Sequence, residues 1–482
     1  MSRPALPNSY VVFKDGQLPK GPLSSGLPIF IGPGVGSAPA NTLVPVNSPN
    51  DVVSLFGVGP LARDVSTFFM SGGNFCYALR LNEDTAGSIG TVTVGSFTGL
   101  TAGGVSHGEF DVRGRCVVAG TLGQAQVVFS LDGGRTWGAP QVLVAGANQV
   151  KGLGGFLPGL TVTPTAMSYT VDPNDLSASS SSEFRFKTVA PQATVANIKL
   201  ALDALIQNPG LFFNLVHISY QAADAAATIV YAGDIAAKML DAEQNWDRYI
   251  WAVIQAPIPA DSTAAITAAQ AIRAGFANKR IQLVIQPLIV KSLGGQFVMN
   301  PSAVAVARRM SLAPQNDLGL VAAGQLISVV DFAPGWTQAG VIGLDAVQNS
   351  VTFRKIFGAA GIYPTNGWMT DPSSDYSMDK FRLIADLCAA DVRTAGVGFI
   401  KMDIDPDDPE RSAQPLIDSC KTPLLQRVNS RPPQLSGVEV TIPPGQDILT
   451  TKTLIVELAL KPIGSADWIQ FNLGFKSPFT GG

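Results

Sequence analysis

The sequence predicts a mixed α/β (α+β) protein that carries an inserted all-β segment and extended arms at both chain ends. Strand and helix signals alternate in residues 21–88 and again in residues 189–376, a pattern typical of a sheet with covering helices. Between these two parts, residues 89–188 hold short strand signals separated by Gly, Ser and Thr, with no amphipathic helix. We therefore expect an α/β core interrupted by a sandwich-like β domain.

The composition indicates a folded chain with little charge for its surface. Of 482 residues, 46% are hydrophobic and only 14% are charged, against roughly 25% charged in typical soluble domains. No apolar run reaches the roughly 18 residues of a membrane span, and the N-terminus lacks the apolar core of a signal peptide. The simplest interpretation is a soluble protein that hides surface against other subunits and does not insert into a membrane.

Residue counts disfavour several function classes. The net charge is −3, and nothing in the charge pattern suggests nucleic-acid binding. The four cysteines are far apart and form no Cys-x-x-Cys pair, so we expect free thiols rather than disulfides or a zinc site. Only two histidines, His107 and His217, are present, so few side chains could act as the histidine of a hydrolase or as metal ligands. We expect neither a cofactor nor a metal.

The first 88 residues contain an arm and the start of the core. Residues 1–20 hold several prolines around a β-prone piece that includes Val11 and Phe13, which predicts an extended N-terminal arm. Residues 21–88 read as a buried strand, two helices and a second strand, which is a βαβ-like unit. The first of these helices follows a cap signal at Ser48.

Residues 130–137 of the β segment, "SLDGGRTW", match the Asp-box pattern of sialidases and other β-propellers. Asp132, Gly133 and Gly134 form a tight-turn sequence, because glycine adopts positive φ at little cost. Strand-forming residues flank the turn, which predicts a β-hairpin with Trp137 packed near it. A propeller needs several copies of the box, and one is present. We interpret the box as a structural hairpin and keep a glycan-binding or glycan-active β domain as the alternative.

Residues 377–466 begin with a strongly amphipathic helix over 378–394. Its apolar face consists of Phe381, Ile384, Ala385, Cys388 and Val392. Lys380, Asp386 and Arg393 lie largely off this face. We expect the apolar face to be buried and the polar side to be exposed.

Residues 467–482 form the second predicted arm. Ile469, Phe471, Leu473 and Phe475 alternate with polar or small residues, which predicts a strand with one apolar face. A strand this regular at a chain end needs a sheet to join, so we expect it to pair with another subunit.

Three other motifs resemble chemical sites but lack the context that the chemistry needs. Ser106 lies in a Gly-x-Ser-x-Gly sequence in which both sides look like strand or loop, so the helix that must follow the nucleophile is lacking, and its histidine could only be His217. Residues 32–36 are glycine-rich and follow a strand, but no helix begins at once. Residues 403–410 have calcium-loop spacing but lack the required Gly and Glu. We interpret all three as turns or loops and expect no catalytic residue.

The motifs at the two ends of the chain occur in a distinctive order. In the N-terminal part they are Phe56-Gly57, Phe68-Phe69, Gly72-Gly73, and Tyr77 with Arg80. In the C-terminal part they are the amphipathic helix, the strand-forming sequence "TLIVELALKPIGSADWIQFNLGF" and a short tail. In this order they resemble the contractile-tail sheath proteins of bacteriophages. The likeness covers both ends well and the α/β middle moderately.

The resemblance implies a structural function and no enzymatic activity. Sheath subunits stack as rings around a tail tube in a metastable extended state. A baseplate signal then releases them into a shorter, wider state, which drives the tube through the host envelope. The implied partners are other copies of the chain, the tail tube protein, and the baseplate and tail-terminator proteins. The implied location is the virion tail, assembled in the host cytoplasm.

The resemblance also implies roles for particular segments. The arm around Val11 and Phe13 and the alternating C-terminal arm would link neighbours by completing a sheet in another subunit. The β insertion would lie on the outside of the sheath. Residues 377–466 would form the inner domain, with Lys380, Asp386 and Arg393 facing the tube.

Overall fold

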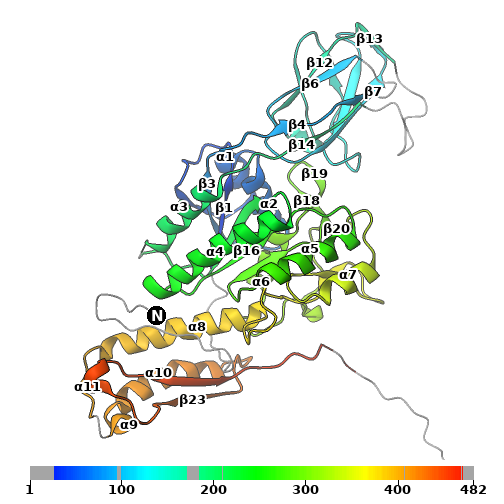
Figure 1. The fold of residues 1–482 in the computed structure, drawn as a ribbon. Helices are drawn as coiled ribbons and strands as arrows, with labels where there is room; N and C mark the ends of the chain where they lie inside the picture. The colour runs from blue at the N-terminus through cyan, green and yellow to red at the C-terminus, as the bar shows by residue number, and fades with distance from the viewer. Residues whose placement is uncertain are drawn as a thin grey trace, which may run out of the picture.

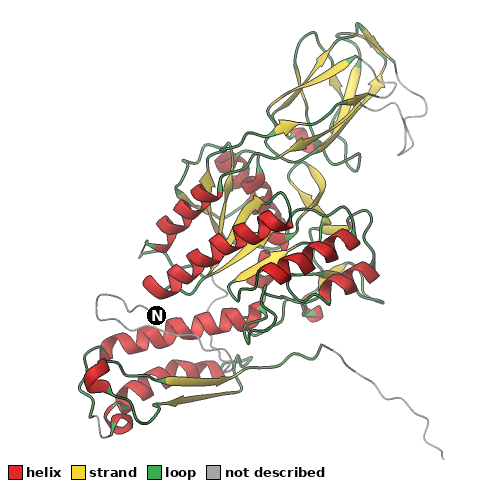
Figure 2. Ribbon diagram, viewed as in Figure 1, coloured by secondary structure: helices red, strands yellow, loops and turns green. Residues whose placement is uncertain are grey.

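The computed structural model describes residues 27–94, 99–170, 184–208, 210–405, 408–467 and 469. Figure 1 shows a β insertion at the top, an α/β core in the middle and a C-terminal unit at the bottom. Helices gather in the core and the C-terminal unit, whereas the insertion consists mainly of strands and loops (Figure 2). The predicted arm positions lie outside the described residues, except Ile469; they are Val11, Phe13, Phe471, Leu473 and Phe475.

A six-stranded sheet in the order β17-β16-β15-β1-β3-β2 forms the centre of the core. Neighbouring strands are parallel except β2, which is an antiparallel edge strand. β1, β16 and β17 are buried along their whole length, as expected for a sheet covered on both faces. The strands are β1 (Pro28–Pro33), β2 (Leu43–Val46), β3 (Cys76–Leu81), β15 (Leu215–Gln221), β16 (Trp251–Gln255) and β17 (Ile281–Val284).

Several helices of the core begin at capping residues: Thr194, Asp224 and Asp261 accept backbone hydrogen bonds at the starts of α3, α4 and α5. α1 starts at Pro49 directly after Ser48, the predicted cap position, but the Ser48 hydroxyl donates to the Asp51 carboxylate and caps no backbone N–H. The helices are α1 (Pro49–Phe56), α2 (Pro60–Met70), α3 (Val195–Ile206), α4 (Ala225–Asn245), α5 (Ser262–Gly275), α6 (Ser302–Ser311) and α7 (Gln338–Asp345).

Two small antiparallel groups of strands follow the main sheet. β18 (Leu288–Ser292) lies between β19 (Gly295–Met299) and β20 (Val329–Phe332), and β21 (Phe353–Lys355) pairs with β22 (Ile362–Pro364). The turn between β18 and β19 contains Gly294, whose φ of 84° favours glycine. The β18–β19 hairpin projects from the core toward the insertion (Figure 1).

The insertion is built of short antiparallel strands. Its larger sheet has the order β10-β9-β7-β14-β4, with β5 also paired to β14, and the smaller groups are β11-β12-β6 and β13-β8. The strands are β4 (Ser88–Ile89), β5 (Thr93–Val94), β6 (Leu100–Gly104), β7 (Asp111–Val118), β8 (Gly120–Thr121), β9 (Gln126–Ser130), β10 (Gln141–Val142), β11 (Asn148–Gln149), β12 (Leu160–Pro164), β13 (Ser168–Tyr169) and β14 (Phe184–Val189).

The chain enters and leaves the insertion at one place. Thr85 and Gln192 exchange two backbone hydrogen bonds of 2.9 and 3.0 Å. Directly beyond them, Ile89 of β4 pairs with Thr188 of β14. The two connections to the core therefore run side by side.

The C-terminal unit is a layer of helices and a two-stranded sheet. α8 (Asp379–Gly396) lies between the core and the rest of the unit, as Figure 1 shows. The remaining elements are α9 (Pro409–Ser412), α10 (Gln414–Val428), β23 (Gly437–Thr441), α11 (Ile448–Thr451) and β24 (Glu457–Lys461).

The hydrophobic clusters do not coincide with the three parts of the molecule, because the insertion and the core share one cluster. One continuous cluster runs from the insertion, through Phe110 and Phe297, into the core. The C-terminal unit has two small clusters of its own. In one of them, Ile384, Cys388 and Val392 of α8 pack with α10 and the sheet, so the middle of the predicted apolar face is buried, whereas Phe381 and Val392 near its ends are half-buried.

Candidate functional site

Two of the three polar residues predicted to be exposed on α8 are buried against the core, so the predicted exposure is wrong for Lys380 and Asp386. Lys380 and Asp386 are each 2% exposed. Sequence periodicity places them off the apolar face, but the core covers that second face of the helix. Arg393, near the helix end, is 29% exposed and forms an ion pair of 2.7 Å with Asp247.

Opposite charges from the core meet the buried polar residues of α8. The Asp386 carboxylate accepts hydrogen bonds from Arg280 at 3.0 Å and from Arg382 one turn earlier on α8. Arg280 also donates to Glu243 of α4 at 2.7 Å. We call this set of four residues the charged junction. Because its members come from α4, α8 and the end of the core sheet, it fixes the C-terminal unit to the core.

A second group of charges lies at the start of α8. The Lys380 ammonium is 2.9 Å from Asp317 and donates to Ser465 at 2.7 Å. Asp379 is fully buried, 3.5 Å from the Arg309 guanidinium. Burial raises the pKa of Asp379 to about 6, although Arg309 opposes this shift.

Sequence analysis missed the core partners of α8. Arg308 and Arg309 lie together on α6, a helix whose other residues are mostly small or apolar and buried. Charged residues are rarely buried without partners. Two arginines inside an apolar helix therefore signal buried polar partners, but they do not identify them: Arg309 meets Asp379 of α8, whereas Arg308 donates to backbone carbonyls of residues 318–323.

The Asp box lies in the loop of a β-hairpin, as predicted, because β9 and β10 pair in antiparallel register with Val127 opposite Gln141. The predicted tight turn is wrong, because residues 131–140 form a longer loop and Thr136-Trp137 are not in a strand. Gly133 and Gly134 have φ values of 75° and 88°, which residues with a side chain rarely adopt. The Arg115 guanidinium stacks on the Trp137 ring at 4.1 Å, beside the turn.

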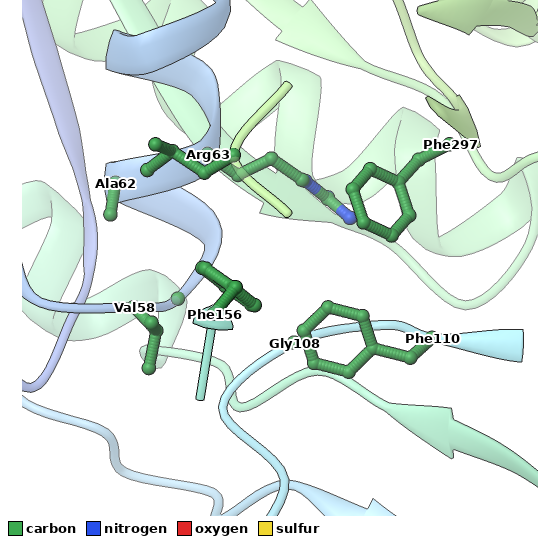
Figure 3. A pocket seen from close by; sticks show the side chains of 9 residues that line it. Val58, Ala62, Arg63, Gly108, Phe110, Phe156 and Phe297 are labelled. Atoms are coloured by element: carbon green, nitrogen blue, oxygen red, sulfur yellow. The ribbon is translucent and has the colours of Figure 1, made fainter. Parts of the chain in front are cut away.

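Aromatic side chains fill the space between the insertion and the core. Phe110 contacts Phe156 within the insertion and Phe297 of β19, with ring centroids 6.1 and 5.9 Å apart. Figure 3 shows these rings around a small cavity, with the Arg63 side chain extending from α2 toward Phe297. The cavity volume is about 20 Å³, room for about one water and no larger ligand.

The residues of the weak hydrolase motif are not brought together. Ser106 is buried in the insertion and donates to the Gly108 carbonyl at 2.7 Å. His217 is buried in the core, where its Nε2 is 2.8 Å from Ser302 Oγ and 3.9 Å from Asp64 Oδ2. In a catalytic triad the carboxylate contacts the other ring nitrogen and the site opens to substrate. This network instead joins β15, α2 and α6, and burial lowers the pKa of His217 to about 4.

The other two weak motifs are also structural where they are described. The glycine-rich loop after β1 packs against the end of α1, where a Cβ on Gly36 would lie 2.2 Å from the Leu55 carbonyl oxygen. Of the acidic stretch, residues 406 and 407 lie outside the described part. Among the described residues, no group of three His, Cys, Asp or Glu side chains is placed to hold a metal. None of the described helices has the length and apolarity for a membrane span.

The two-stranded sheet of the C-terminal unit directly precedes the second predicted arm along the chain. β23 and β24 pair over five positions, from Gly437 with Lys461 to Thr441 with Glu457. Within residues 408–467, no third strand joins them. Ile469, the one described arm position, is 72% exposed.

Comparison with known proteins places this architecture in a family. A family model described as the DUF2586 N-terminal domain matches residues 10–368. The chain belongs to the DUF2586 family. A comparison with curated proteins gave no match.

Solved sheath structures share the fold over nearly the whole chain. The PVC sheath of an extracellular contractile injection system, in its contracted state, is 12% identical with a TM-score of 0.52, covering 99% of each chain. The contracted helical sheath of the anti-feeding prophage is 12% identical with a TM-score of 0.52, covering 98% of this chain and 99% of that chain. The chain therefore has the fold of contractile sheath proteins, which confirms the predicted resemblance at the level of fold.

A crystal structure from Listeria innocua is also similar. This sheath tail protein, Lin1278, is 13% identical with a TM-score of 0.49, covering 92% of this chain and 94% of that chain.

Proposed function

We propose that the chain is the structural subunit of a contractile tail sheath, with no catalytic role. The observation that carries the proposal is the fold shared with two contracted sheath assemblies over 98% or more of this chain. In this proposal, copies stack as rings around a tail tube in an extended state. Contraction then drives the tube through an envelope.

The proposed partners follow from this assembly. They are other copies of the chain, a tail tube protein, and the baseplate and tail-terminator proteins of a tail built in the host cytoplasm. The insertion, residues 89–188, would form a sandwich-like domain on the outer surface. Its position in the molecule supports this, because it lies at the end of the core away from the C-terminal unit (Figure 1).

The proposed link between subunits is a strand exchange. The C-terminal arm, residues 467–482, and the N-terminal arm around Val11 and Phe13 would pair with a sheet of a neighbouring subunit. The two-stranded sheet β23–β24 is the candidate acceptor, because strand addition needs an edge with free backbone groups. Each strand hydrogen bond contributes about 0.5 to 1.5 kcal/mol, and each buried large side chain about 1.5 to 3 kcal/mol.

Removal of residues 467–482 tests the proposal. We expect a folded, soluble and mostly monomeric protein that forms no striated tubes, measured by sedimentation and negative-stain electron microscopy of the purified chain. Tubes of normal appearance from the truncated chain, or outright unfolding, would place the arm in its own subunit's core.

A matched pair of substitutions separates the two faces of the arm. Phe471→Ser with Leu473→Ser changes the apolar face and should abolish tubes. Gln470→Ser with Asn472→Ser changes the opposite face and should leave tubes intact, since these side chains need no buried partner.

A further inference from the structure

The Asp132 carboxylate accepts four hydrogen bonds from residues of the Asp box and one from outside it. Within the turn, its Oδ1 accepts from Ser130 Oγ and from the Arg135 and Thr136 N–H groups at 2.8, 2.9 and 2.9 Å. Its Oδ2 accepts from the Thr136 hydroxyl at 2.6 Å and from the Gln296 N–H of β19 at 2.8 Å. Gln296 is 164 residues away and belongs to the core.

The core hairpin is shaped to let this carboxylate approach. A Cβ on Gly295 would lie 2.8 Å from Asp132 Oδ2 and 3.0 Å from Thr136 Oγ1. A Cβ on the neighbouring Gly294 would lie 2.7 Å from the Phe156 ring of the insertion. The hairpin tip is therefore in close contact with two loops of the insertion, and glycine is the residue that fits both contacts.

The same end of the hairpin is also tied to α2 of the core, because Ser292 pairs with Gly295 beside the turn. Ser292, the last residue of β18, is 3.0 Å from the Thr67 hydroxyl of α2 and donates to the Arg63 carbonyl at 3.3 Å. A continuous path of hydrogen bonds and close contacts thus runs from α2, through the hairpin, to Asp132. Asp132 itself is 2% exposed, so water competes little for its carboxylate.

From these contacts we infer that Asp132 is an interdomain latch: its bond to the Gln296 N–H holds the insertion in one orientation on the core. The Asp box thus acts as a structural device that joins two domains. The insertion and the core move as one body while the latch is closed. This inference does not depend on the proposed sheath function, because it concerns the orientation of two parts of one chain.

Asp132→Asn opens the latch selectively. The amide oxygen can take the place of Oδ1 and keep its three turn bonds, while the NH₂ group takes the place of Oδ2 and faces the Gln296 N–H, donor against donor. We expect amide hydrogen exchange at Gln296 in the full chain to become about tenfold faster, the effect of losing one hydrogen bond. Ser130→Ala is the matched control, because it removes bonds within the turn alone.

A distance measurement reports the orientation directly. Met167 of the insertion and Val230 of α4 are 76% and 69% exposed, and the four native cysteines are buried. Spin labels at Met167→Cys and Val230→Cys should give one narrow distance distribution, which Asp132→Asn broadens and Ser130→Ala does not.

Gly295→Ala tests the latch from the core side if Asp132→Asn folds poorly. Its methyl group would lie 2.8 Å from Asp132 Oδ2 and crowd the carboxylate away from the Gln296 N–H, so it should broaden the same distribution without any change of residue in the Asp box. The inference is overturned if Gln296 exchange and the distance distribution stay unchanged in the folded variant, or if Ser130→Ala alters both to the same extent.

Discussion

The β insertion and the C-terminal unit attach to opposite ends of the same core, through junctions of different chemistry (Figure 1). At the insertion, one buried carboxylate is surrounded by neutral N–H and hydroxyl donors, beside a group of aromatic rings. At the C-terminal unit, buried carboxylates meet guanidinium and ammonium groups. Each neutral donor to the Asp132 carboxylate contributes modestly and several share it, whereas removal of one partner from a buried ion pair leaves a charge of the opposite sign uncompensated, which is costly. The charged junction should therefore be the more sensitive of the two.

Removal of Asp386 should give the largest effect on stability. Asp386→Ala leaves Arg280 and Arg382 buried side by side without their shared carboxylate. We expect the free energy of unfolding to fall by about 3–5 kcal/mol, measured by urea denaturation of the full chain. A loss below 1 kcal/mol would mean that the two arginines find other partners, and the contrast between the junctions would fail.

The pH dependence of stability should show two opposite contributions. The pKa of Asp379, beside the charged junction, is raised to about 6, so its contribution is present at low pH and is lost as pH rises through 6. The pKa of His217, in the core, is lowered to about 4, so its contribution is present above pH 6.5 and is lost as pH falls toward 4. Each amounts to about 3 kcal/mol, from shifts of about two units or more.

Single variants should separate these contributions. Urea denaturation between pH 4 and 7 should show stability rising more steeply with pH in Asp379→Asn, because the opposing slope is removed. His217→Gln should show stability falling as pH rises. Parallel profiles for both variants and the parent chain would contradict the assignment.

An exposed ion pair should give the smallest effect. Lys199 and Asp234 connect α3 and α4 at 2.9 Å, with side chains 37% and 38% exposed. Lys199→Ala should lower stability by about 0–1 kcal/mol, and high salt should abolish this difference. The loss in Asp386→Ala should persist at high salt. Equal salt sensitivity would mean that charge alone, rather than burial, makes the junction sensitive.

Parts of the fold could be predicted where the signals are local. The start of α1 after Ser48, the apolar face of α8 and the glycines of the Asp box each depend on neighbours within a few residues. The β18–β19 hairpin was missed, although Gly294-Gly295 between two β-prone runs is a hairpin signal.

The junctions could not be predicted, because they depend on what covers a surface. Periodicity shows that Lys380 and Asp386 lie off the apolar face of α8. It does not show whether solvent or oppositely charged residues of another part of the chain cover that side of the helix. Likewise, nothing near Asp132 in the sequence indicates that its carboxylate meets the backbone of Gln296. Contacts between distant residues follow from the fold as a whole.

The paired connections at Thr85 and Gln192 make the insertion a natural exchange point. These two residues are hydrogen-bonded to each other, so the chain segments that follow β3 and precede α3 are held together before the strands of the insertion begin. Recombination could replace the whole cassette while leaving the core sheet in register. The same geometry offers a graft site for a foreign domain whose termini lie close together, which each chain would carry once.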